Sequence, residues 1–215
     1  MRIVIVDYGS GNLHSVHKAL ERAARNLDRT EIVVTSKPDL VRSADRIVLP
    51  GVGAFADCKQ GLLSVEGLIP ALGDVVVRAG RPFLGICVGM QLLATTGMEH
   101  ETTMGLGWID GIVAPLQPCD TRLRIPHMGW NTLTVSQNHE LLRNIPLGDK
   151  GLHAYFVHSF HFLADARETT IATTEYGGKV CAVVARDNIA GSQFHPEKSQ
   201  QMGLAFLENF LRWRP

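Results

Sequence analysis

The stretch Arg-Pro-Phe-Leu-Gly-Ile-Cys-Val-Gly-Met-Gln at residues 81–91 decides the fold. An apolar strand over 83–86 is predicted to run into a Gly-x-Cys-x-Gly turn, with a helix pattern directly after it. This is the nucleophile-elbow arrangement with Cys in place of Ser, and it projects the sulfur above a sheet edge. The helix would direct free N–H groups and its positive dipole end at Cys87. The motif favours a catalytic Cys87; a buried structural cysteine is the alternative.

Upstream of this stretch, strand-like and helix-like segments alternate. Strands are predicted at 2–7, 31–35 and 45–49, and helices at 13–25, 56–64 and 68–78. Such alternation predicts a parallel, doubly wound sheet with helices on both faces. Right-handed crossovers then place the turns after residues 7, 49 and 86 at one edge, where open α/β sheets bind ligands.

Downstream of this stretch, the sequence pattern is typical of β-strands. Strands are predicted at 108–116, 129–135, 152–162, 169–176 and 179–186, with a hairpin turn at 176–179. A last strand at 189–194 precedes an amphipathic helix at 200–213. The predicted fold is therefore α/β, with a mixed, mostly parallel sheet, helices on both faces and an antiparallel extension in the C-terminal half. No repeat or linker divides the chain, so residues 1–215 are predicted to form a single domain.

Composition narrows the classes of function. The chain is 45% hydrophobic, and its 21 basic residues balance its 21 acidic residues, which gives no sign of nucleic-acid binding. No apolar run approaches the length that spans a membrane, and residues 1–7 are predicted as a strand instead of a secretory signal. The four scattered cysteines argue against a disulfide framework and favour a reducing cytoplasm.

A second candidate motif is Gly-Ser-Gln-Phe-His-Pro-Glu at residues 191–197. At a strand end, His195 and Glu197 are predicted to point to the same side, because strand side chains alternate. A carboxylate beside an imidazole fixes its tautomer and stabilises the imidazolium. Alone, His195 is best interpreted as a core or loop histidine. Together with the cysteine elbow, the pattern predicts a nucleophile Cys87, a base His195 and an orienting Glu197.

A cysteine nucleophile needs donors for the oxyanion that forms during attack. Val88 N–H lies at the predicted helix start, next to the sulfur. The second donor is expected from the turn after the neighbouring strand, where Val52 stands between Gly51 and Gly53. Val52 N–H is the predicted donor, and Gly53 is also assigned to the oxyanion hole. The two glycines would lower the energy needed to flip the Val52 peptide.

These motifs carry a resemblance. The segments at 85–91, 50–53 (Pro-Gly-Val-Gly) and 195–197 (His-Pro-Glu) resemble the signatures of class I (triad) glutamine amidotransferases. Two further stretches, Asp-Tyr-Gly-Ser-Gly-Asn-Leu at 7–13 and Pro-His-Met-Gly-Trp-Asn at 126–131, are similar to glutaminase subunits of imidazole glycerol phosphate synthase, in histidine biosynthesis. The resemblance covers essentially the whole chain.

The resemblance implies a reaction and its binding residues. Cys87 would attack the side-chain amide of glutamine, form a glutamyl thioester and release ammonia, with no metal or organic cofactor. A (β/α)8-barrel cyclase partner would use the ammonia to make imidazole glycerol phosphate and aminoimidazole carboxamide ribotide. Glutamine-binding residues implied in the same way are Gln91, Gly51 and the strand at His158, Ser159 and Phe160. Many relatives have Tyr where this chain has Phe160, so a backbone role there would survive.

Docking to that partner is expected at Asn12, Met128 and Trp130, because Trp and Met are enriched at interfaces. A core position for Trp130 is an equal alternative on composition alone. Competing functions are a stand-alone cysteine hydrolase of the same fold, another triad amidotransferase with a different acceptor, and a catalytically silent binding module. The intact Cys87, His195 and Glu197 argue against the silent module.

Overall fold

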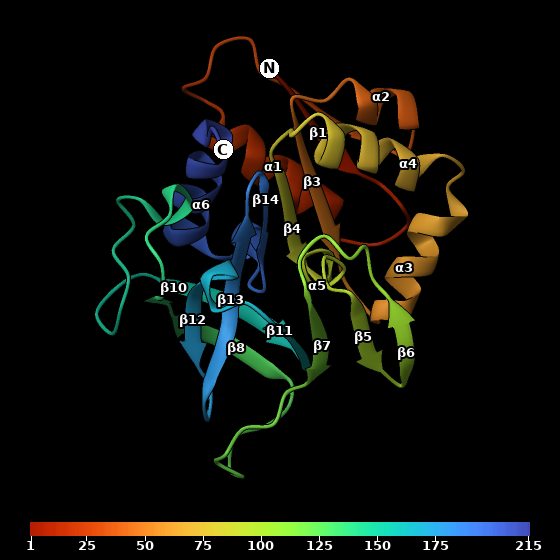
Figure 1. Ribbon diagram of the computed structural model, residues 1–215. Helices are drawn as coiled ribbons and strands as arrows, with labels where there is room; N and C mark the ends of the chain where they lie inside the picture. Colours follow the sequence, from red (N-terminus) through yellow and green to blue (C-terminus); the bar gives the residue numbers. More distant parts are fainter.

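A mixed eight-stranded sheet forms the centre of the computed structural model, which describes all residues 1–215 (Figure 1). Its strand order is β2–β1–β3–β4–β14–β13–β12–β9. The first five strands are parallel and the others are antiparallel, which confirms the predicted sheet with its C-terminal antiparallel extension. In sheet order, the strands are β2 (Glu31–Thr35), β1 (Arg2–Val6), β3 (Arg46–Gly51), β4 (Phe83–Cys87), β14 (Ile189–Ser192), β13 (Lys179–Arg186), β12 (Thr170–Glu175) and β9 (Thr134–Val135).

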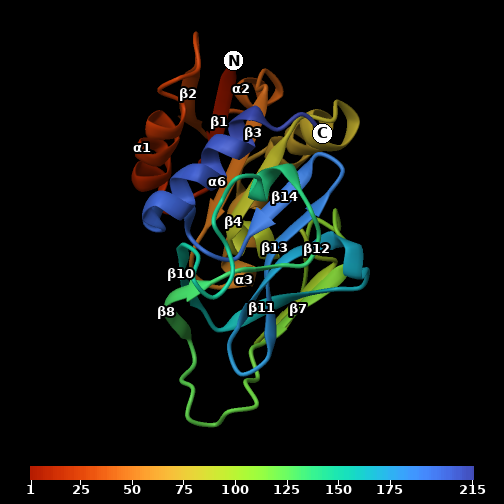
Figure 2. The same ribbon diagram turned by 90° about the vertical axis from the view of Figure 1, so that its left-hand side faces the viewer.

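The central strands are buried because helices cover both faces of the parallel half. β3 and β4 are buried at every residue, and their apolar side chains do not alternate with polar ones, as expected of a sheet covered on both faces. α1 (Leu13–Ala23) and α6 (Gln200–Arg212) pack together on one face. α2 (Pro38–Arg42), α3 (Phe55–Ser64) and α4 (Leu68–Leu72) cover the other, as Figures 1 and 2 show. The predicted second helix of this layer continues from α4 as a π-helical turn, Gly73–Arg78.

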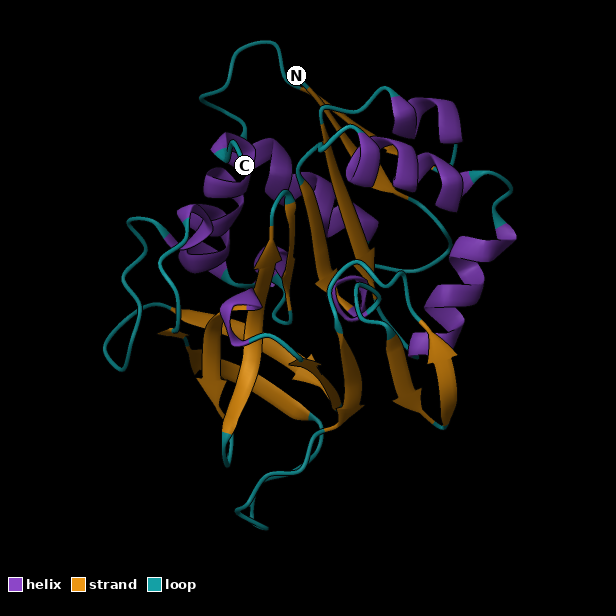
Figure 3. Cartoon of the chain, viewed as in Figure 1, coloured by secondary structure: helices purple, strands orange, loops and turns teal.

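Two smaller sheets lie beyond the carboxyl ends of the parallel strands (Figure 3). One has the order β11–β7–β5–β6, and in the other β8 pairs with β10. The strands are β5 (Thr96–Glu99), β6 (Glu101–Met104), β7 (Gly111–Pro115), β8 (His127–Thr132), β10 (His153–His158) and β11 (Phe160–Ala164). Short 3-10 helices occupy Glu140–Leu142, Arg167–Thr169 and Pro196–Lys198.

The structure corrects several element predictions. The strand predicted over 129–135 is divided into β8 and β9, which join different sheets. The single strand predicted over 152–162 is wrong: it breaks at Ser159 into β10 and β11, which join different sheets. The strand predicted from residue 108 starts only at Gly111. The short helix α2 and the hairpin of β5 and β6 were not predicted, because each has few residues and carries little hydrophobic periodicity.

One connected cluster of 56 buried residues forms the hydrophobic core. It extends from β1 to Trp213 and includes the elbow residue Cys87. No single helix has the length and apolar content to cross a membrane, and one helix pair bent by 95°, Phe55–Ser64 with Leu68–Arg78, meets that criterion on length and composition only.

Candidate active site

Cys87 lies at a sharp turn between β4 and α5 (Val88–Gln91), with φ +54° and ψ −111°. A positive φ is unusual for a residue other than glycine and is typical of strained functional turns. The flanking glycines allow a close approach: a Cβ on Gly85 would overlap the Gly89 carbonyl, and a Cβ on Gly89 would overlap the Leu49 carbonyl. α5 is a single turn, shorter than the sequence pattern indicated, so only its first N–H groups face the sulfur.

His195 and Glu197 are paired as predicted, but for a different reason. His195 Nδ1 lies 2.8 Å from Glu197 Oε1, and both side chains are buried. β14 ends at Ser192, and Glu197 is in the 3-10 helix Pro196–Lys198, so strand alternation does not place the pair. Backbone bonds fix His195 instead: its N–H donates to Tyr155 O at 2.9 Å, and its carbonyl accepts from Ser199 Oγ at 2.6 Å.

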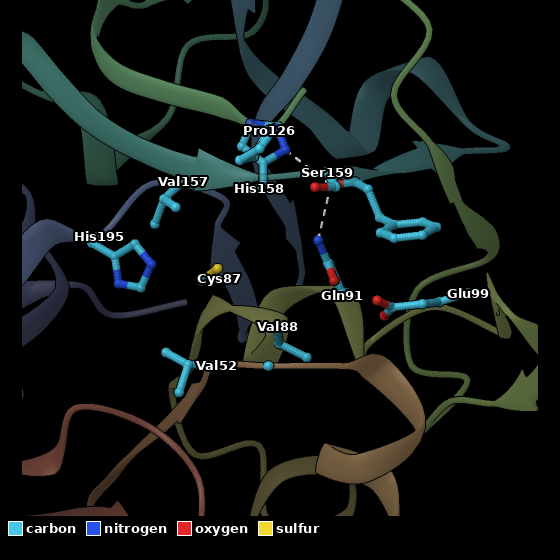
Figure 4. Close-up of a pocket in the computed structure, with 12 residues that line it drawn as sticks. Val52, Cys87, Val88, Gln91, Glu99, Pro126, Val157, His158, Ser159 and His195 are labelled. Carbon is cyan, nitrogen blue, oxygen red and sulfur yellow. Dashed lines mark hydrogen bonds between the residues drawn. The ribbon is translucent and has the colours of Figure 1, made fainter. Parts of the chain in front are cut away.

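The environment of His195 favours a proton on Nε2, the ring nitrogen that does not bond to Glu197. Because Nδ1 is bonded to Glu197, Nε2 is the nitrogen available to react, and it has no partner within the protein. Burial alone would lower the pKa of His195, but its interactions with Cys87 and Glu197 outweigh burial and raise that pKa. Figure 4 shows the His195 ring and the Cys87 sulfur facing the same cavity.

The cavity at the elbow has a volume of about 290 Å³ and suits a small ligand. Residues of the parallel strands, the smaller sheets and the loop that carries His195 line the cavity. Nine predicted site residues line it; Gly51 and Glu197 do not. Gly51 is buried against the Tyr8 hydroxyl and Val88. The lining residues are Val52, Gly53, Cys87, Val88, Gln91, Glu99, Pro126, Val157, His158, Ser159, Phe160 and His195.

The predicted oxyanion donor Val52 N–H is engaged elsewhere in this structure. It donates to Ser10 Oγ at 3.1 Å, and the same hydroxyl lies 2.7 Å from the Val52 carbonyl, to which it donates. Cys58 Sγ, 3.3 Å away, also donates to that carbonyl. Gly53 follows with φ +92°, a conformation that favours glycine. Val88 N–H, at the first position of α5, remains beside the sulfur.

Two polar residues of the site were missed by sequence reasoning. Glu99, at the end of β5, lines the cavity, and its Oε2 accepts the Phe55 N–H at 2.8 Å, where the α3 N-terminus favours a negative charge. Gln193 is fully buried, and its Nε2 lies 3.7 Å from Cys87 Sγ. Gln193 lies within the motif at 191–197, two positions before His195, and that position was the signal in the sequence that could have identified it. Glu99 had none, because its hairpin was not predicted.

The side chain of Gln91 has its orientation fixed by the protein. Its Nε2 donates to the Phe160 carbonyl at 3.0 Å (Figure 4). The same nitrogen donates to Gln193 Oε1 at 3.0 Å. Both N–H groups are therefore used, and Gln91 Oε1 is left as the acceptor for a ligand. The Phe160 carbonyl also accepts from His158 Nδ1 at 2.9 Å. Its two lone pairs are therefore used by Gln91 and His158.

The three residues predicted at a docking surface differ in exposure. Met128 is 62% exposed and Trp130 is 47% exposed, so the core alternative for Trp130 is wrong. Asn12 is half-buried and caps α1, with its Oδ1 accepting the Ser15 N–H at 3.3 Å. No group of three or more His, Cys, Asp or Glu residues is arranged to hold a metal ion.

We compared the chain with known protein families and structures. The model of the family "Glutamine amidotransferase class-I" matches residues 4–213. The chain belongs to the class I glutamine amidotransferases. Similar curated proteins include "Imidazole glycerol phosphate synthase subunit HisH" of Rhodopseudomonas palustris, 58% identical, and that of Bradyrhizobium diazoefficiens, 57% identical, each over 100% of both chains. These relatives confirm the expected glutaminase subunit of imidazole glycerol phosphate synthase in histidine biosynthesis.

Solved structures of lower identity share the amidotransferase fold. PurLQS from Thermotoga maritima aligns with a TM-score of 0.69 at 18% identity, over 98% of this chain and 97% of that one. The glutaminase domain of Trypanosoma brucei CTPS with bound acivicin aligns with a TM-score of 0.63 at 15% identity, over 100% of this chain and 95% of that one. At this identity the likeness supports the fold alone.

Proposed function

We propose that Cys87, His195 and Glu197 catalyse the glutaminase reaction, with the whole chain 1–215 acting as one domain. A single observation carries the assignment: the elbow thiol and the free nitrogen of a Glu-paired imidazole reach one small cavity from separate elements. Cys87 passes its thiol proton to His195 Nε2, and its Sγ attacks the side-chain amide carbon of glutamine. His195 Nε2–H protonates the departing nitrogen, so the carbon–nitrogen bond breaks, ammonia leaves and a glutamyl thioester remains. His195 then takes a proton from water, which attacks the thioester carbon; the carbon–sulfur bond breaks, glutamate is released, and the proton returns from His195 to Cys87 Sγ.

Glutamine is recognised through the carboxylate of Glu99 and the oriented amide of Gln91. Glu99 Oε1 and Gln91 Oε1 are acceptors without a hydrogen bond to the protein, and both residues line the cavity. Together they suit the α-ammonium group of glutamine. The backbone at Val157, Ser159 and Phe160 forms the facing wall. The ring of Phe160 offers no hydroxyl, so its support to the site is through the carbonyl that holds Gln91.

The oxyanion hole is proposed to be completed during activation. Val88 N–H is one donor, and Val52 N–H becomes the second once its peptide rotates away from Ser10. Gly51 and Gly53 flank the residue that must rotate, which keeps the backbone cost low. The isolated subunit is therefore expected to be nearly inactive.

The proposed partner is a (β/α)8-barrel cyclase that docks over Asn12, Met128 and Trp130. Two of these side chains are large, apolar and exposed, at the end of the molecule that holds the cavity. Ammonia needs a route closed to water, because most of it would become ammonium at neutral pH and lose its nucleophilicity. We place this enzyme in the cytoplasm, where a reactive thiol such as Cys87 stays reduced.

Glutamate release tests the proposal. It is measured with this subunit alone, with the cyclase, and with the cyclase and its ribulosyl nucleotide ligand. Strong activation only in the last mixture is expected. Equal activity in all three would indicate a stand-alone hydrolase.

The variant Cys87→Ala should abolish glutamate release and leave the cyclase dissociation constant unchanged, because the thiol is the nucleophile and its side chain is buried. Partner binding is measured by calorimetry. Loss of binding in this variant would make Cys87 a structural residue and would contradict the assignment.

A further inference from the structure

Strand β8 presents different residues to its two faces. Met128 and Trp130 are exposed on one face, whereas His127 is 3% exposed on the other. His127 lies directly opposite His158 of β10 in the strand register. Period-two alternation therefore gives one strand both the proposed docking side chains and a buried histidine.

A continuous series of hydrogen bonds starts on that buried face. Asn131 Nδ2 lies 3.4 Å from His127 Nε2, and His127 Nδ1 lies 3.0 Å from His158 Nε2. His158 Nδ1 lies 2.9 Å from the Phe160 carbonyl, which also holds Gln91. Gln91 then bonds to Gln193, whose amide nitrogen lies 3.7 Å from the sulfur of Cys87.

The direction of each bond follows from the groups at its ends. A carbonyl only accepts, so His158 Nδ1 carries a proton and His158 Nε2 accepts from His127 Nδ1–H. At the other end, Asn131 has its amide orientation fixed, because Nδ2 donates to the Glu175 carbonyl and Oδ1 accepts the Thr132 N–H. Burial lowers the pKa of His127 to about 4 and that of His158 to about 3, so both rings are neutral at pH 7.

We propose that His127 is a positioning residue that couples partner docking on β8 to the orientation of Gln91 in the glutamine pocket. Contact at Met128 and Trp130 shifts β8, and His127 moves with the strand. The bond to His158 transmits the shift to the Phe160 carbonyl and so to Gln91. No proton is transferred along the series. The inference rests on the proposed glutaminase function, whose regulation it concerns.

A purely structural role for His127 makes different predictions. The ring is stacked between Phe156 and Tyr176, with centroid distances of 4.7 and 4.0 Å. His127→Phe keeps a ring in this stack but removes the donor to His158. His127→Asn loses the ring but keeps an N–H near the position of Nδ1. Tyr176→Phe is the matched control, because it keeps the stack and removes only the hydroxyl bonded to the Arg124 carbonyl.

Glutamine binding is measured by calorimetry in a Cys87→Ala background, where glutamine is not hydrolysed. The free subunit and its complex with the cyclase are compared. His127→Phe is expected to weaken glutamine binding to the complex about tenfold, the size of one hydrogen bond, and binding to the free subunit by less than about threefold. His127→Asn should restore most of the loss, and Tyr176→Phe should change neither value. An unchanged complex in His127→Phe, or an equal loss in Tyr176→Phe, would overturn the proposal.

Nitrogen-15 NMR of the histidine rings tests the coupling without any need for activity. In the wild-type chain, cyclase binding should shift the ring nitrogens of His158, although that residue is buried, and His127→Phe should remove the shift. A His158 signal that does not respond to cyclase overturns the inference. If the wild-type complex with the ribulosyl nucleotide ligand releases no glutamate, the proposed function fails, and the NMR result alone then decides whether docking reaches His158.

Discussion

At the scale of single residues, carbonyl groups decide where protons lie in this site. The Phe160 carbonyl fixes the His158 tautomer and one N–H of Gln91. The Glu197 carboxylate does the same for His195 and leaves Nε2 toward the cavity. His195 and Gln91 are therefore each left with one polar atom that has no partner in the protein, Nε2 of His195 and Oε1 of Gln91.

The buried histidine pair predicts how stability depends on pH. Because burial lowers the pKa of His127 and His158 below the ordinary 6.5, the unfolded chain binds more protons than the folded chain below that value. Their contribution is complete above about pH 6.5 and is lost as pH falls toward about 4. Each ring should cost up to about 1.4 kcal/mol per pH unit in that window.

Urea unfolding of the wild type and of His127→Phe between pH 7.5 and 5 measures this effect. The variant lacks one of the two titrating rings, so its free energy of unfolding should fall less steeply with acid. Parallel pH profiles for the two proteins would show that His127 does not titrate below its ordinary range. Refolding yields at each pH serve as the control for reversibility.

At the scale of elements, the elbow packs closely against β3. Gly89 lies so close to the Leu49 carbonyl that neither backbone can yield to a side chain. Gly89→Ala should therefore destabilise the fold by about 3 kcal/mol. The matched control is Gly73→Ala, because Gly73 has helical φ and open space at its Cβ position, so this change should be neutral or slightly stabilising. Thermal unfolding of both variants tests the difference, and equal stability would contradict the close contact.

The sequence predicted some of the helices, strands and turns correctly and others not. The parallel strands and the elbow were predictable, because buried apolar runs and the Gly-x-Cys-x-Gly spacing are local signals. The break at Ser159 was not, because both halves of the segment are equally strand-like and only their partners, β8 and β7, separate them. The contacts of Ser10 and Glu99 were not predictable for a related reason, because each residue bonds to a backbone group more than forty positions away in the chain.

At the scale of the whole molecule, the cavity lies where three sheets meet. β4 supplies Cys87, the four-stranded sheet supplies Glu99, and the break between β10 and β11 supplies the facing wall. The exposed face of β8 lies at this same end. A partner that covers this end can therefore close the cavity to water and contact the exposed face of β8 at the same time.

Trp130→Ala should weaken cyclase binding by about 2 kcal/mol, because exposed aromatic residues dominate binding energy at interfaces. The stability of the isolated subunit should change little, since Trp130 is already 47% exposed. Leu63→Ala is the control: its side chain is 56% exposed but lies on α3. Calorimetric titration with the cyclase measures both, and equal dissociation constants for wild type and Trp130→Ala would place the interface elsewhere.

The alternation along β8 also limits how this chain can change in length. A deletion or insertion of one residue between His127 and Trp130 would place their two side chains on the same face of the strand, because the side-chain period is two. Either the imidazole would then face solvent or the indole would face the core. Substitutions can alter either face separately, but a change of one position in length always misplaces one of these two side chains. The loop at 117–126 before the strand has no such constraint, so variation in length is expected to collect there.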